Sequence, residues 1–145
     1  MKVVVAIDGR TSAQTAVEHI VKQNYAQDTQ ILLVHVIVPG FADAPVEGIP
    51  DVVEEERQEE KSVLANTKKQ LQEKLSIEAT TAILNGEVAQ VIADECKRFD
   101  ADEVIVPSHA RHGFSRLWFG SVADEIVDEA PCTVVVLKMP QDSKR

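Results

Sequence analysis

Continuous apolar runs mark the predicted strands of this chain. Lys2 to Ile7 reads KVVVAI, Gln30 to Val38 reads QILLVHVIV, and Thr133 to Leu137 reads TVVVL. Runs that lack polar alternation are typical of strands buried on both faces of a parallel sheet. Glu103 to Val106 predicts a fourth strand of this kind. Ile77 to Leu84 alternates, which indicates another strand nearer the sheet edge.

Helical periodicity separates these strands. Apolar residues recur at spacings of three and four over residues 11–25, 51–75, 88–98 and 121–129. Thr11 or Ser12 is a good N-cap for the first of these helices. The long second helix carries one stripe along its length, formed by Val53, Glu60, Leu64, Thr67, Leu71 and Leu75. Strands that alternate with helices predict an α/β fold, in which a five-stranded parallel sheet has helices on both faces.

The strand order decides where a ligand would bind. Right-handed crossovers leave 2-1-3-4-5 and 3-2-1-4-5 as the common orders for five strands. In the second order, which we adopt, the winding reverses between the first and fourth strands. Ligands bind at such a reversal, outside the carboxyl ends of the strands. Asp8-Gly9 and Pro107-Ser108-His109 follow those two strands, so this order predicts a crevice between them.

An acid-free stretch begins at the same place. Val104 to Val122 contains no Asp or Glu, although about three would be expected at the chain's overall density. It contains Arg111 and Arg116, and it ends at Gly120-Ser121, where a helix begins. A helix N-terminus offers unpaired N–H groups to an anion. The stretch therefore predicts an anion site, and a solvated loop with two arginines is the alternative.

Composition narrows the class of protein. A length of 145 residues and 44% hydrophobic content indicate one domain, residues 1–140, with a polar tail at 141–145. A net charge of −9 argues against nucleic-acid binding. No run is long enough to span a membrane. Cys96 and Cys132 have no metal-binding or disulfide spacing, and no metal site is expected. We expect a soluble, cytoplasmic protein.

Asp8 is the candidate polar residue of the crevice. It is followed by Gly9-Arg10, so the second aspartate that a Mg²⁺-dependent phosphoaspartate enzyme needs is missing. The chain also lacks a P-loop and a dinucleotide-binding glycine motif. These observations favour hydrogen bonding by Asp8 over catalysis, with a purely turn-shaping role as the alternative. His35 lies inside the second strand and is interpreted as a core histidine.

The chain resembles the universal stress protein family over nearly its whole length. VVVAIDGRTSAQTAV is similar to the family's first strand and its aspartate-bearing turn, and LLVHVIVP is similar to the second strand. The C-terminal half, which includes GSVADEIV and APCTVVVL, is similar almost without gaps. The resemblance implies a Rossmann-like fold of the adenine nucleotide alpha hydrolase type.

One branch of that family binds ATP through Gly-x2-Gly-x9-Gly-[Ser/Thr]. On this chain the motif runs from Pro107 through Ala110 to Gly120-Ser121, so both leading glycines are replaced. Proline has no N–H to offer a ligand, and alanine is costly in a left-handed conformation. The resemblance implies contacts with ATP or AMP, accompanied by Mg²⁺, from Ala6, Ile7, Asp8, Val36, Val106, Pro107, Ser108, His109, Ala110, Arg111, Arg116, Gly120, Ser121, Val122 and Ala123.

The resemblance also implies a homodimer in which the last strands, Thr133 to Leu137, pair with each other. The expected function is that of a dimeric, ATP- or AMP-binding regulatory protein of the stress response. It is not an efficient enzyme, and slow ATP hydrolysis is the most that we expect. The alternative is a dimeric interaction protein that holds no nucleotide, because Pro107 and Ala110 replace motif glycines. Its protein partner is unknown.

Overall fold

The computed structural model describes residues 1–39, 52–108 and 120–140. Helices and strands alternate from one end of the described chain to the other. In order they are β1 (Lys2–Ala6), α1 (Arg10–Lys22), β2 (Gln30–Ile37), α2 (Val52–Leu75), β3 (Ala79–Asn85), α3 (Val88–Phe99), β4 (Glu103–Pro107), α4 (Gly120–Glu129) and β5 (Thr133–Leu137). The predicted α/β class is confirmed.

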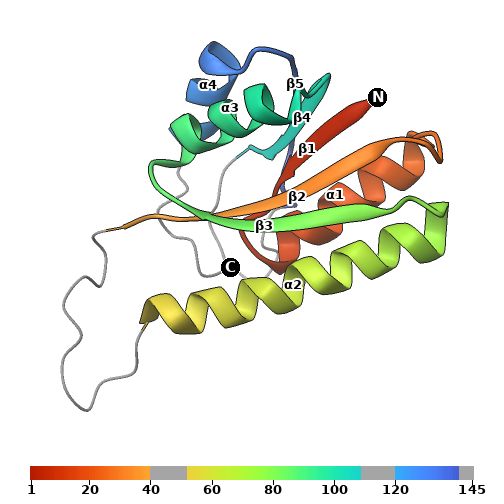
Figure 1. Ribbon diagram of the computed structural model, residues 1–145, viewed down its shortest axis with the longest axis horizontal. Coiled ribbons are helices and arrows are strands. Elements are labelled where there is room, and N and C mark those ends of the chain that lie inside the picture. The colour runs from red at the N-terminus through yellow and green to blue at the C-terminus, as the bar shows by residue number, and fades with distance from the viewer. Residues whose placement is uncertain (40–51, 109–119, 141–145) are drawn as a thin grey trace.

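The strands form one parallel sheet in the order β3-β2-β1-β4-β5. β1 lies in the centre, where Val5 is level with Leu33 on one side and Ile105 on the other. α1 and α2 cover one face, and α3 and α4 cover the other (Figure 1). The adopted order 3-2-1-4-5 is therefore confirmed, and β3 and β5 are the edge strands.

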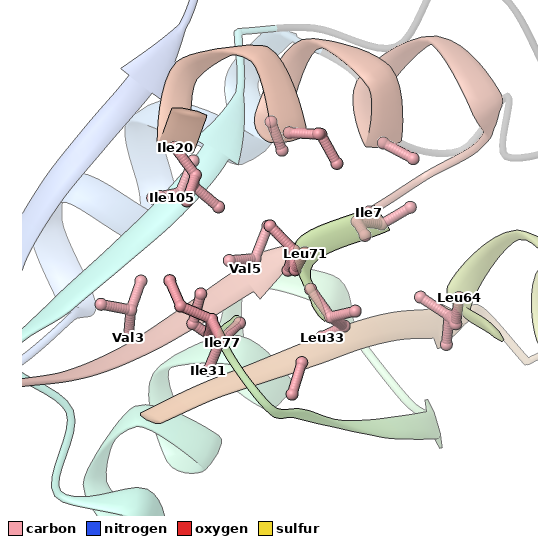
Figure 2. Packing of buried hydrophobic residues seen from close by; sticks show 14 of the residues in the cluster. Val3, Val5, Ile7, Ile20, Ile31, Leu33, Leu64, Leu71, Ile77 and Ile105 are labelled. Carbon is pink, nitrogen blue, oxygen red and sulfur yellow. The ribbon is translucent and has the colours of Figure 1, made fainter. Parts of the chain in front are cut away.

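Strand side chains alternate between two apolar layers. Val3, Val5 and Ile7 belong to the layer against α1 and α2, which also contains Leu33 and Leu71 (Figure 2). Val4 and Ala6 belong to the opposite layer, against α3 and α4. Because both faces are covered, the central strands need apolar residues at every position, which explains the absence of alternation in their sequence.

The first helix begins earlier than expected. We predicted Thr11 or Ser12 as its N-cap, and this is wrong: the N-cap is Gly9, without a side-chain cap bond. Gly9 has a φ of 148°, a conformation that side chains other than glycine rarely adopt. This turn lets the helix begin at Arg10, so Ser12 lies within its first turn.

The third strand also begins later than Ile77. Ser76 has a left-handed φ of 57°, and the Ile77 N–H donates to the Leu71 carbonyl at 3.3 Å. Ile77 therefore lies in the connection after α2, hydrogen-bonded back to the last turn of the helix, and its side chain is buried. As expected, β3 is an edge strand with several exposed side chains. No helix in the described ranges is long and apolar enough to cross a membrane.

Candidate functional site

The carboxyl ends of β1 and β4 form the candidate site. The two strands are neighbours, paired through Val5 and Ile105. After β1 the chain enters α1 on one face, whereas the helix that follows β4 in the described chain, α4, covers the other face. Strand ends whose following helices lie on opposite faces leave a crevice between them, and this is where open α/β sheets bind ligands. The expected position of the crevice agrees with the observed topology.

Asp8 lies at this point and is 4% exposed. Its backbone N–H donates to Ser12 Oγ at 2.8 Å, and the Ser12 hydroxyl donates to the Gly9 carbonyl at 3.1 Å. These two bonds hold the turn that follows β1. Asp8 Oδ2 is buried and has no hydrogen-bond partner among the described residues. A buried acceptor without a partner is unfavourable, which makes Asp8 a candidate to accept a hydrogen bond from a ligand.

Burial raises the pKa of Asp8 to about 6, while the hydrogen bond with Ser12 and the positive charge of His35 act in the opposite direction. A carboxyl group with a perturbed pKa at a sheet-end crevice is a common feature of functional sites. The sequence indicated Asp8 as a candidate binding residue, and the structure shows the burial that raises the pKa of its carboxyl group.

The apolar residues expected around a ligand fall mostly in one layer. Ala6, Val36, Val106, Val122 and Ala123 all belong to the cluster between the sheet and helices α3 and α4. Val36 and Val106 are fully or almost fully buried. Ile7 is different, because its side chain belongs to the opposite layer.

Pro107 and Ser108 end β4 as extended chain. Pro107 pairs with Leu137 of β5, and the Ser108 N–H donates to the Leu137 carbonyl at 2.8 Å. The Ser108 hydroxyl accepts a bond from the Met139 N–H at 3.2 Å. Both residues are thus tied to the β5 side of the sheet.

Several expected site residues cannot be placed. His109, Ala110, Arg111 and Arg116 lie outside the described residues, and so does the side chain of Ser121. The predicted helix start at Gly120-Ser121 agrees with α4, which begins at Gly120. The acid-free loop itself stays a prediction.

Sequence reasoning missed a buried polar cluster behind Asp8. His35 Nδ1 donates to the Ile7 carbonyl at 2.8 Å, and His35 Nε2 lies 2.7 Å from Glu56 Oε2. Glu60 Oε1 lies 3.2 Å from His35 Nδ1. His35 and Glu60 are both fully buried. The signal was present in the sequence, because Glu60 stands within the apolar stripe of the α2 helix.

The charges in this cluster influence one another. Burial raises the pKa of Glu60 to about 7, although the charge of His35 acts against this. Burial alone would lower the pKa of His35, but the hydrogen bond with Glu56 and the charge of Glu60 outweigh it, so this pKa is raised. Within the described ranges, no group of three or more His, Cys, Asp or Glu side chains is arranged to hold a metal ion.

Comparisons with known proteins point to a single family. A model described as the universal stress protein family matches residues 1–138. A universal stress protein of Methanocaldococcus jannaschii is 26% identical over 141 residues, which cover 97% of this chain and 83% of that protein.

Solved structures share the fold. The universal stress protein of Archaeoglobus fulgidus in complex with dAMP has a TM-score of 0.70 at 20% identity, covering 95% of this chain and 98% of that one. A universal stress protein family protein of Arabidopsis thaliana with AMP bound has a TM-score of 0.66 at 22% identity. The match covers 100% of this chain and 96% of that one.

Proposed function

The chain belongs to the universal stress protein family, and we propose that it binds an adenine nucleotide, ATP or AMP, at the carboxyl ends of β1 and β4. The observation that carries this proposal is the buried Asp8 Oδ2, which lacks a hydrogen-bond partner among the described residues. A sugar hydroxyl or the adenine amino group would donate to it and remove the unfavourable unpaired state. The relatives crystallised with AMP and dAMP support this ligand class.

The remaining contacts follow from the arrangement of the elements. The apolar layer that contains Ala6, Val36 and Val106 would flank the base. The phosphates would lie toward the N-terminus of α4, where Gly120 begins the helix and unpaired N–H groups attract anions. Arg111 and Arg116 are the cations that would offset phosphate charge. Mg²⁺ would arrive with the phosphates.

We propose a regulatory role in the stress response in preference to catalysis. Asp8 is the carboxyl group of the crevice, and a hydrogen-bonding function accounts for its position. A slow hydrolysis of ATP is compatible with this role. The cytoplasmic location expected from the sequence remains a prediction.

We also propose that the protein acts as a homodimer through β5. Within the described chain, β5 is an edge strand that pairs with β4 alone. Its sequence, TVVVL, is uncharged, and Val136 is 44% exposed. An apolar open edge favours pairing with another strand. Light scattering coupled to size exclusion should give the dimer mass at micromolar concentration, and a purely monomeric mass would contradict this.

Pro107 favours a second candidate function, that of an interaction protein without nucleotide. Successive amide groups of a strand point to opposite edges. Ser108 donates toward β5, so an N–H at position 107 would point toward the β1 side, where the crevice lies. Proline has no N–H there. The lost donor would weaken binding of an anionic or carbonyl-bearing ligand.

Two measurements separate these functions. The protein is purified without added nucleotide and denatured, and the released small molecules are identified by mass spectrometry. Copurified adenine nucleotide supports the first function. If none is found and calorimetry shows no binding, the Pro107→Gly/Ala110→Gly double variant is titrated with ATP-Mg. Binding by this variant alone would establish that the two replacements have closed the site.

A further inference from the structure

The surroundings of His35 determine its charge. Within the described residues, its ring nitrogens face the Ile7 carbonyl at 2.8 Å and Glu56 Oε2 at 2.7 Å. A carbonyl only accepts hydrogen bonds, so Nδ1 must carry a proton. Nε2 faces the Glu56 oxygen, where a protonated nitrogen can donate. Although burial acts to lower it, the pKa of His35 is raised by the hydrogen bond with Glu56 and the charge of Glu60, so these contacts favour an imidazolium.

The His35 ring lies among acidic side chains. The buried Asp8 comes from the turn after β1, and the buried Glu60 and the partly exposed Glu56 come from α2. Arg10 of α1 is 76% exposed and is paired with Glu59 of α2 at 2.7 Å. On β3, the residue level with His35 is the uncharged Ile83. Among the described residues, His35 is thus the buried cation available to balance these carboxylates.

The position of His35 links it to Asp8. The carbonyl that accepts its Nδ1 proton belongs to Ile7, the residue immediately before Asp8. The ring charge therefore lies close to a carboxylate that is itself almost fully buried. A nearby opposite charge favours the ionised form of a carboxyl group, whereas burial disfavours it.

We infer that His35 is a positioning residue of the nucleotide site: its buried imidazolium keeps Asp8 ionised and fixes the β1 terminus, so that Asp8 can accept a hydrogen bond from the ligand. This inference rests on the proposed nucleotide binding. It assigns the ligand's contact at Asp8 to a hydrogen-bond donor, which is a sugar hydroxyl or the adenine amino group.

A defined pH dependence follows. Asp8 accepts the ligand's hydrogen bond when ionised, so affinity falls as pH drops through its pKa of about 6. Removal of the His35 charge raises this pKa further, by about one unit at the lower end of the usual range for a close opposite charge. The affinity of a neutral variant should then be about fivefold weaker than wild type at pH 6, about twofold weaker at pH 7 and equal at pH 8.5.

The test compares His35→Gln with His19→Gln, a matched substitution on the partly exposed side of α1. AMP is titrated into each protein by calorimetry between pH 5.5 and 8.5. The readout is the ratio of variant to wild-type Kd at each pH, because titration of the AMP phosphate cancels in this ratio. The ratio should rise toward low pH for His35→Gln and stay near one for His19→Gln.

A ratio for His35→Gln that is constant with pH would overturn the inference while nucleotide binding stands. An absence of AMP binding by the wild type at every pH would refute the proposed function and the inference with it. A second measurement does not depend on folding of the variant. Nitrogen NMR of the wild-type His35 ring should show both nitrogens protonated at pH 6, and a neutral ring there would also overturn the inference.

Discussion

Asp8 should lower the stability of the ligand-free protein, and Asp8→Asn should remove this effect. The carboxyl group is 4% exposed, and burial raises its pKa from 3.8 to about 6. Between these two values the folded state holds a proton that the unfolded state has released. Stability must therefore fall as pH rises through this interval, and the loss is complete above about pH 6.

The magnitude follows from the shift. A difference of 2.2 between the two pKa values corresponds to about 3 kcal/mol. The asparagine amide has its own unpaired polar group in the same place, which opposes folding by about 1–3 kcal/mol. That term does not depend on pH, so it cancels when two pH values are compared. The stability of Asp8→Asn relative to wild type should therefore be about 3 kcal/mol greater at pH 8 than at pH 3.5.

Urea denaturation of both proteins without nucleotide, at several pH values from 3.5 to 8, measures this difference. Asp28→Asn is the matched control, because Asp28 is exposed at the opposite end of the sheet. If the relative stability of Asp8→Asn stays constant within about 0.5 kcal/mol, the carboxyl group is not desolvated as the structure indicates. The reasoning that makes Asp8 a binding residue would then lose its basis.

Three further substitutions test the fold and the assembly. Gly86→Ala should lower stability by about 1–3 kcal/mol, because Gly86 has a φ of 143° and a Cβ would lie 2.6 Å from Val91 Cγ2; an unchanged Tm would contradict this. Leu71→Ala should cost about 2–5 kcal/mol in urea denaturation, since the side chain is fully buried, whereas the exposed Lys68→Ala should have little effect. Val136→Lys should convert the proposed dimer to a monomer in light scattering, and a retained dimer would exclude β5 as the interface.

The architecture could be predicted because burial on both faces leaves a strong signal. β1 and β2 are apolar except for Lys2, Gln30 and His35, and TVVVL matches the bounds of β5. The ends of the helices and strands were harder to predict from the sequence. Ser76 takes a left-handed conformation after the end of α2, and Ile77 hydrogen-bonds back to Leu71. β-branched composition alone cannot distinguish such a residue from the start of a strand.

The candidate site was predictable in position but not in chemistry. The order of strands and helices placed Asp8 directly after β1, beside the end of β4, because topology alone determines which strand ends diverge. The pairing of His35 with Glu56 and Glu60 depends on the packing of α2 against β2. Such contacts join residues that are distant in sequence. Glu60 stood out only as a charged residue within an apolar stripe, and that is a weak signal without its partner.

Calorimetric titration of nucleotide-free protein with ATP-Mg tests the central claim most directly. The wild type and Asp28→Asn should bind with the same micromolar Kd, and Asp8→Asn should lose most of the affinity while remaining folded. Equal binding by all three proteins would show that Asp8 does not contact the nucleotide. An absence of binding by the folded wild type, with AMP also inactive, would contradict the nucleotide-binding account itself.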